Sequence, residues 1–385
     1  MVLVRARWAA RVAFATQGLV FISLTTRLPD FSDRWDLSEA ELSGLLLMMV
    51  LLAGVGSVLA ENLARQRDSA TLLRAGLALV VAAVPVMALA PGLTVFVAGM
   101  AGYGVALGVV DATTNMQAVA LEHRYGRPIL PSFHGAWTLG GLVGSAITLA
   151  TAALPLEATT ALAVVPLVAL TRPFLKRVGD PLAAGPRIEV PWRPIILVGI
   201  AMVLFYMVDT AAFTWGPTYL DHVFPTPSSL VALATFPYLL ASGTMRLAGD
   251  SVVARFGPVR VLRVGALVAC AGLAVVVFAP TWPVAVLGFL VMGAGVAVIA
   301  PLSFSAAARI AGRGEDDPHT RHARVDAVIA RFNQFNYLGA LIGAVLTGLV
   351  GAGNLRIGFA VPMVLVLGIL PLARSFGARV SQPGL

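Results

Sequence analysis

The sequence predicts an all-α integral membrane protein that crosses the bilayer with twelve transmembrane helices. Of its 385 residues, 58% are hydrophobic and only 12% are charged, and its mean hydropathy is +0.87. A water-soluble protein of this length needs a much larger charged surface. The apolar residues form continuous runs of about 20 residues, the length that an α-helix needs to cross a bilayer. A β-barrel would show shorter segments of alternating polarity, so helices are the predicted spans.

Six apolar runs occupy the N-terminal half of the chain. The first begins within "MVLVRARWAARVAF", which has no small-residue cleavage site before the run ends, so we expect an uncleaved span rather than a signal peptide. The hairpin "LAPGL" separates the third run from the fourth and is too short to hold a domain. The predicted spans are 8–28, 39–60, 70–90, 93–119, 131–153 and 157–175.

Six further runs follow the segment "RVGDPLAAGPRIEVPWR", which is rich in Pro and Gly and is therefore not helical throughout. A second short hairpin, "FAPTW", separates the third and fourth runs of this half. The predicted spans are 194–216, 228–248, 261–280, 282–307, 327–350 and 355–376.

The two halves repeat each other. "ENLARQRDSATLLRAG" (Glu61–Gly76) aligns without a gap on "DSVVARFGPVRVLRVG" (Asp250–Gly265), and "FHGAWTLGGLVG" (Phe133–Gly144) aligns in the same way on "FNQFNYLGALIG" (Phe332–Gly343). We therefore predict two pseudo-symmetric six-helix bundles, residues 1–176 and 194–385, joined by a cytoplasmic linker at 177–193. Homologous halves around a cavity at the membrane midplane are typical of transporters.

The net charge of +8 reflects topology. With both termini inside, all of the 27 Lys and Arg residues except Arg27, Arg34 and Arg356 fall in or beside cytoplasmic ends and loops. The first outer loop is acidic. This positive-inside bias predicts a multi-pass protein of the bacterial cell (inner) membrane with cytoplasmic termini. It also argues against nucleic acid as a partner.

No pattern in the chain indicates an enzyme. The sequence has no Gly-x-Ser-x-Gly, His-Glu-x-x-His or Walker motif. Cys270 is its one cysteine, which excludes an internal disulfide and a thiolate metal cluster. His319 and His322 lie in a charged loop without other metal-type ligands. We expect no cofactor, no resident metal and no enzymatic activity.

Several motifs resemble those of the major facilitator superfamily. "GDSVVARFGPVR" resembles the conserved loop of that superfamily, and "SVLAENLARQR" resembles a degraded copy, with Glu61 in place of Asp and Ala64 in place of Gly. "DATTN" resembles the Glu-x-x-x-Asn of the fucose permease-like sugar–proton symporters. "RYGRPILPSFHGAW" and "DTAAFTWGPTYL" resemble an uncharacterised bacterial branch near that group. The chain departs from the sugar permeases in its first helix, where it has Gln17 and Arg27 instead of an acid.

Asp111 lies inside an apolar run, which is the reason to predict a proton-coupling site there. Asn115 shares its helix face at i+4, and Gly104 and Gly108 lie close to the same stripe, where small residues permit close approach of a helix or a ligand. Removing a carboxylate from water favours its neutral form, so Asp111 is expected to bind and release a proton. The alternative is a hydrogen bond that joins two helices. Asn115 is a candidate substrate-binding residue.

Asp209 is the corresponding acid of the second half and the other candidate proton-coupling residue. Intramembrane acids usually mark a functional site or pair with a neighbour. Arg27, at the outer end of the first helix, is a candidate partner and, with Gln17, a candidate substrate-binding residue. The alternative is that Asp209 pairs with a neighbouring helix and never titrates.

The fifth and eleventh spans supply the other substrate-binding candidates. Trp137 lies on a helix that lines the cavity in the superfamily, as the resemblance implies, whereas His134 is expected to cap or contact loops. Asn333, Asn336 and Tyr337 share a stripe of the eleventh span. Buried amides cost free energy unless they are hydrogen-bonded, so this stripe favours a polar ligand.

Charged residues at cytoplasmic helix ends predict a gate. The candidate gate residues at these ends are Glu61, Arg65, Asp250 and Arg255, and Arg331 is expected to belong with them. A carboxylate at a helix end that pairs with Arg from another helix forms a breakable lock.

Together these features predict a secondary active transporter of a small solute that works by alternating access and is coupled to protons. Uptake (symport) is favoured because the fifth span reads "LGGLVGSAI", without the Gly-Pro pair of efflux members. The alternatives are a proton-driven drug or metabolite efflux antiporter and, from another class, a membrane receptor or assembly factor that has lost transport. The expected partners are a small-molecule substrate, protons and membrane lipid, with the protein a monomer.

Overall fold

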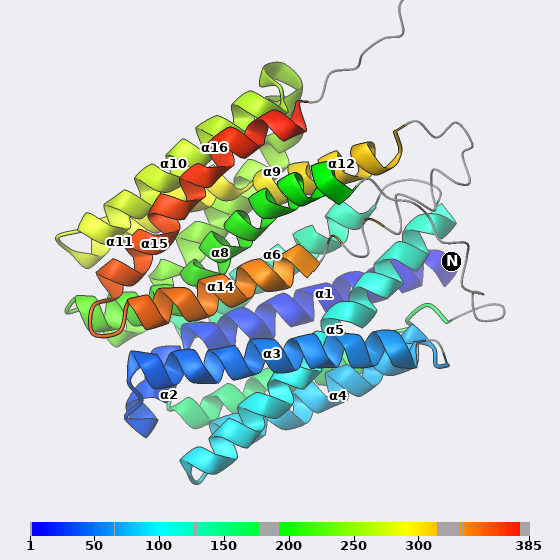
Figure 1. The fold of residues 1–385 in the computed structure, drawn as a ribbon. Helices are drawn as coiled ribbons and strands as arrows, with labels where there is room; N and C mark the ends of the chain where they lie inside the picture. Colours follow the sequence, from blue (N-terminus) through cyan, green and yellow to red (C-terminus); the bar gives the residue numbers. More distant parts are fainter. Residues whose placement is uncertain are drawn as a thin grey trace, which may run out of the picture. The chain divides into compact units, whose positions relative to one another are not determined.

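The computed structural model describes residues 2–64, 66–125, 129–176, 192–313, 328, 332 and 334–377, and every regular element within them is a helix (Figure 1). The first half contains α1 (Val2–Thr26), α2 (Leu28–Trp35), α3 (Glu39–Leu63), α4 (Ser69–Ala88), α5 (Leu93–Tyr125), α6 (Leu130–Ala150), the 3-10 helix η1 (Leu156–Ala163) and α7 (Val164–Leu170).

The second half contains α8 (Trp192–Val223), η2 (Ser228–Ala234), α9 (Phe236–Phe256), α10 (Pro258–Phe278), α11 (Trp282–Val296), α12 (Ile299–Ala311), α14 (Gln334–Val350), α15 (Leu355–Leu365), η3 (Val366–Gly368), α16 (Ile369–Leu372) and η4 (Ala373–Phe376).

The predicted all-α, twelve-helix membrane fold is confirmed. Within the described residues nine helices are long and apolar enough to cross a membrane, and Leu156–Leu170 and Gln334–Val350 are shorter apolar helices. The 21-residue helix α6 matches the remaining predicted span.

The chain forms two compact units. Unit 1 comprises Met1–Ala184 and Gly216–Phe236, and unit 2 comprises Gly185–Trp215 and Pro237–Leu385. The segment Gly216–Phe236, which the sequence places in the C-terminal bundle, therefore groups with unit 1. The exact bundle boundaries at 176 and 194 stay a prediction, and most of the predicted linker lies outside the described residues.

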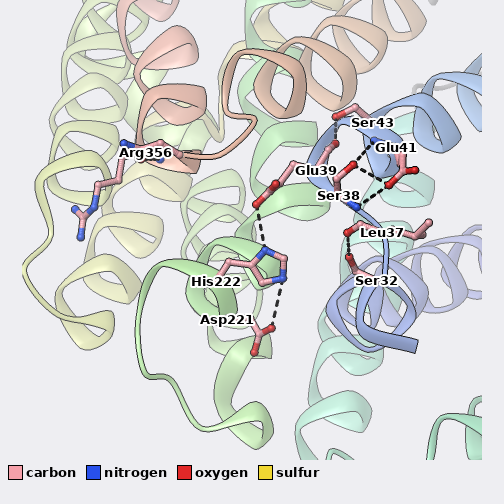
Figure 2. Close-up of polar contacts among 10 residues, drawn as sticks. Ser32, Leu37, Ser38, Glu39, Glu41, Ser43, Asp221, His222 and Arg356 are labelled. Carbon is pink, nitrogen blue, oxygen red and sulfur yellow. Dashed lines mark hydrogen bonds and ion pairs between the residues drawn. The ribbon is translucent and has the colours of Figure 1, made fainter. Parts of the chain in front are cut away.

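The acidic segment between the first two predicted spans contains a helix that the span prediction does not include. Pro29 lies in the first turn of α2, where a missing N–H costs nothing. The helix ends at Asp36, whose φ of 50° is left-handed, and the N–H of Leu37 donates to the carbonyl oxygen of Ser32. Ser38 then caps α3 in a reciprocal capping box with Glu41 (Figure 2). These caps fix the geometry of the junction between α2 and α3.

The predicted span 282–307 is broken into α11 and α12 at residues 297–298. Pro301 explains the break, because proline has no N–H with which to bond the carbonyl oxygen of Ala297 four residues earlier. The guanidinium of Arg246 supplies a donor in place of the missing N–H, and its Nε donates to the Ala297 carbonyl oxygen at 3.2 Å.

Helices of unit 1 pack closely through glycines. α1 lies along α6, and α3 lies along α5 (Figure 1). A Cβ added to Gly108 of α5 would collide with the carbonyl oxygen of Ala53 on α3, and one added to Gly104 would collide with that of Met49. The glycines beside Asp111 therefore admit a neighbouring helix, which is one of the two partners that the sequence allowed.

Gly108→Ala is expected to destabilise the protein by about 1–3 kcal/mol, the usual cost of overpacking a close contact. The measurement is thermal unfolding of the purified protein in detergent. Gly102→Ala is the matched control on the same helix, because nothing lies within 4 Å of its added Cβ. Equal unfolding temperatures for the two variants would contradict the packing that we describe.

Gln117 of α5 joins three segments of unit 1 and is almost fully buried. Its Nε2 donates to the Ser69 hydroxyl at 2.8 Å and to the Leu175 carbonyl at 2.9 Å, and its Oε1 accepts from the Leu175 N–H at 2.8 Å. These bonds hold α4, α5 and the segment after α7 together at the end of the α5 helix.

Candidate functional site

Asp111 is held by two amide side chains in unit 1. Gln17 of α1 donates from Nε2 to Asp111 Oδ1 at 3.2 Å. Asn115 donates from Nδ2 to the Asp111 carbonyl oxygen at 2.9 Å and to Oδ1 at 3.4 Å. All three side chains are partly buried. The structure thus brings together three predicted site residues, and the bond between α1 and α5 matches the alternative of a helix–helix contact.

The Oε1 atom of Gln17 is buried and has no hydrogen-bond partner within the described part of the chain. Gln17 also lines a cavity of about 10 Å³ between α1, α4 and α5, together with Thr16, Tyr103 and apolar residues. This volume is close to the minimum that one water molecule needs. Beside the amide group that donates to Asp111 there is therefore an oxygen atom, Gln17 Oε1, that can accept a further hydrogen bond.

Asp209 of α8 is a buried carboxylate of unit 2, with 6% of the residue exposed. The hydroxyl of Tyr238 on α9 donates a short hydrogen bond to Asp209 Oδ1, and Tyr238 itself is fully buried. The guanidinium of Arg246, two turns further along α9, acts electrostatically on the same carboxylate. Phe213 packs edge-on against the Tyr238 ring at 5.3 Å.

Tyr238 and Arg246 are not among the residues that the sequence predicts for the site. Arg246 carries little signal, because a long arginine side chain at the end of the span Ser228–Arg246 can reach the membrane surface without a partner. Tyr238 carries no signal in the sequence, because a single tyrosine in an apolar helix does not show which residue of a neighbouring helix it contacts.

The structure gives Arg27 and Asp209 partners other than each other. Arg27 forms an ion pair with Asp30 at 2.7 Å and donates to the Thr151 carbonyl oxygen at 2.6 Å, all within unit 1. Asp209 has its partners on α9, within unit 2. Contact of Asp209 with a neighbouring helix agrees with the alternative that the sequence left open.

Trp137 packs against α1 through its ring and its backbone. Its ring lies 6.4 Å from that of Phe21, and its carbonyl oxygen lies where a Cβ on Gly18 would be. His134, one turn earlier, is exposed and meets the Phe14 ring edge-on at 5.5 Å. A role of Trp137 in stacking on a substrate stays a prediction.

The remaining predicted residues are described only in part. Asn336 and Tyr337 are partly buried on α14, whereas Asn333 and Arg331 lie outside the described residues. Arg65 and the side chain of Asp250 also lie outside them.

The other two gate candidates are exposed. Glu61 lies near the end of α3, and Arg255 lies at the end of α9 with its guanidinium 5.2 Å from the centre of the Phe256 ring. The substrate stripe on α14 and the gate stay predictions.

Comparison with known proteins shows similarity to one family of transporters. A family described as Major Facilitator Superfamily matches residues 198–383. An uncharacterized MFS-type transporter of Yersinia pestis is 26% identical over 379 residues, which covers 95% of this chain and 94% of that protein. The C-terminal half of the chain matches the major facilitator superfamily, and the relative from Yersinia pestis extends the similarity to MFS-type transporters over both halves. This similarity agrees with a multi-pass membrane protein of the transporter type.

Solved structures of this superfamily share the fold. The D-xylose–proton symporter matches with a TM-score of 0.71 and 14% identity, over 97% of both chains. The transporter FucP in the outward conformation matches with a TM-score of 0.62 and 17% identity, over 97% of this chain and 99% of that one. At this identity the likeness establishes the fold alone and leaves the substrate open.

Proposed function

We propose that this protein is a secondary active transporter of the major facilitator superfamily that moves a small solute by alternating access and couples the movement to protons. The observation that carries the proposal is the bonding of Asp111, an intramembrane carboxylate held by the neutral amides of Gln17 and Asn115. A coupling residue must be stable both with and without its proton. The surroundings of Asp111 satisfy this condition.

The amide of Gln17 can serve both states of Asp111. In the ionised state the carboxylate accepts from Gln17 Nε2. In the protonated state the new O–H is a donor, and rotation of the Gln17 amide would present Oε1, which has no partner in the described residues. The ionised carboxylate thus has amide donors, and the protonated carboxyl has an acceptor for its hydroxyl. Asp111 is therefore the proposed proton carrier.

Asp209 has a different environment and is the second candidate. Burial favours its neutral form, whereas the Arg246 guanidinium and the hydrogen bond from the Tyr238 hydroxyl favour the charged carboxylate. Movement of Arg246 away from Asp209 would therefore favour binding of a proton. This arrangement suits a carboxylate that couples to a substrate or a conformational change.

The proposed substrate is a small polar solute. The proposed substrate-binding residues are Gln17, Arg27, Asn115, Trp137, Asn333, Asn336 and Tyr337. Two of the solved structures with this fold are described as a fucose–proton and a D-xylose–proton symporter, which supports coupling to protons. Uptake is proposed because α6 lacks a Gly-Pro pair. The competing functions are proton-driven efflux and a receptor without transport.

The charge pattern supports an inner-membrane location with both termini in the cytoplasm, and a monomer is the proposed state. In this orientation Glu61, Arg65, Asp250 and Arg255 would form the cytoplasmic gate.

The experiment is a thermal-shift screen followed by a flux assay. The purified full-length protein is screened against sugars, sugar acids, nucleosides, amino acids and drugs, because a bound ligand raises the unfolding temperature by mass action. Hits are then tested for counterflow in proteoliposomes, which needs no proton gradient. We expect counterflow of at least one hit above empty liposomes. Binding without counterflow for every hit would support the receptor and overturn transport.

A further inference from the structure

A second polar cluster lies away from Asp111, at the end of unit 1 where α2 meets α3. Asp33 of α2 and the pair Asp221 and His222 at the end of α8 each place one ligand-type atom within 4.8 Å of the others. His222 Nε2 lies 3.7 Å from Asp221 Oδ2. Two carboxylates and one imidazole therefore converge, although Asp33 and His222 come from opposite halves of the sequence.

Glu39 orients the imidazole from its other side. Its Oε1 lies 3.4 Å from His222 Nδ1, so His222 sits between Glu39 and Asp221 (Figure 2). Histidines that bind metals commonly donate their second ring N–H to a carboxylate, which fixes the tautomer and leaves the first nitrogen as a ligand. With Nδ1–H directed at Glu39, the lone pair of Nε2 faces the side of Asp221.

The backbone holds Asp33 and Glu39 in place before any ion binds. The left-handed residue Asp36 ends α2, the Ser32 hydroxyl donates to the Leu37 carbonyl oxygen at 2.8 Å, and Ser38 caps α3. Little backbone entropy remains to be lost at this junction when the carboxylates bind a ligand. The cluster is thus preorganised on its α2–α3 side.

The charges of the cluster are not balanced by the two arginines of the same segment. Arg27 pairs with Asp30, and Arg34 pairs with Glu157 at 2.9 Å. Asp33, Asp221 and Glu39 then surround an imidazole that is at most singly charged. Like charges held this close repel one another, and a divalent cation would relieve the repulsion.

We propose that Asp33, Asp221 and His222 bind a divalent transition-metal ion, with Zn²⁺ the best fit, and that Glu39 is the residue that positions His222. An imidazole with two carboxylates suits Zn²⁺ and its first-row neighbours, whereas Mg²⁺ and Ca²⁺ prefer oxygen ligands alone. The ligand atoms would close to about 2.0–2.2 Å from the ion, and water would complete the coordination. The exposed position of Asp33 and His222 gives the ion access from solvent.

The test uses tag-free, EDTA-treated full-length protein in detergent, titrated with ZnCl₂ by calorimetry and by thermal unfolding. Wild-type protein should bind one Zn²⁺ and unfold at a higher temperature, whereas Mg²⁺ and Ca²⁺ at the same concentration should change nothing. His222→Gln and Asp221→Asn should weaken binding at least about 100-fold. Glu39→Gln should weaken it about 10- to 100-fold and leave the metal-free unfolding temperature unchanged.

Asp36→Asn is the matched control, because it removes a carboxylate from the same junction and asparagine accepts the left-handed conformation. It should bind Zn²⁺ like the wild type. A Zn²⁺ effect that persists in His222→Gln would mean an adventitious ion and would overturn the proposal. The proposal would also be overturned if Zn²⁺ had no effect while acid stabilised the wild type but not His222→Gln. In that case a protonated His222, and not a metal ion, would bind the carboxylates. These assays need no transport, so their failure leaves the proposed function untouched.

Discussion

Asp111→Asn is expected to abolish solute accumulation driven by a pH gradient and to leave solute exchange across the membrane intact. The substitution is nearly isosteric and keeps an acceptor for Gln17 Nε2, so the contact between α1 and α5 survives. It mimics the protonated acid permanently, and a residue that cannot release a proton cannot transmit the gradient. The measurement is accumulation of a substrate found by the thermal-shift screen, at imposed pH gradients in proteoliposomes. We expect a loss of at least about 100-fold, down to the level of empty liposomes.

Asp36→Asn serves as the control for reconstitution and for loss of one negative charge, because Asp36 is exposed at the end of α2. It should accumulate substrate like the wild type. Loss of both exchange and accumulation in Asp111→Asn, together with a lower unfolding temperature, would favour a structural hydrogen bond. Accumulation at the wild-type level would exclude Asp111 as the carrier and leave Asp209 as the next candidate.

Asp209→Asn is expected to lower the free energy of unfolding by about 3 kcal/mol, because it removes the opposite charge from Arg246. The amide can still accept from the Tyr238 hydroxyl, so the loss reports the charge rather than the hydrogen bond. The transport rate of the variant should fall together with its stability. The measurement is thermal unfolding in detergent of Asp209→Asn, Arg246→Gln and the double variant.

The double variant supplies the control, because a pair of interacting charges shows non-additive losses. Removing both charges should recover most of the stability that either single substitution loses. A double variant as unstable as the sum of the two singles would contradict an Asp209–Arg246 pair. Tyr238→Phe isolates the hydrogen bond and should cost about 1–3 kcal/mol, since it leaves a buried acceptor with one partner fewer.

The membrane fold follows from the sequence because every span needs a long apolar run, and such runs are visible without any tertiary information. The breaks within the spans depend on single residues. The presence of Pro301 in the sequence predicts that one backbone hydrogen bond is missing in the span 282–307. The sequence does not predict that Arg246, 55 positions before Pro301, supplies a replacement donor to the carbonyl oxygen of Ala297.

For the polar contacts too, the sequence predicts those within one helix and not those between helices. The neighbouring positions of Asp111 and Asn115 are set by helical periodicity, so the sequence predicts that they share a face. Gln17 lies on a different helix, 94 residues away from Asp111, and periodicity carries no information about that contact. The same limit hides the Tyr238–Asp209 bond and the cluster of Asp33, Asp221 and His222. In that cluster the sequence shows only an acidic segment and one histidine at the end of a span.

Proton movement caused by the substrate tests the central claim most directly. A pH-sensitive dye trapped inside proteoliposomes reports the lumen while substrate is added outside, without an imposed gradient and with the membrane potential clamped. The account predicts that the substrate acidifies the lumen of wild-type liposomes and that Asp111→Asn carries substrate by exchange without any change of pH. Net substrate entry into wild-type liposomes with no change of pH would contradict it, and so would acidification by Asp111→Asn at the wild-type rate.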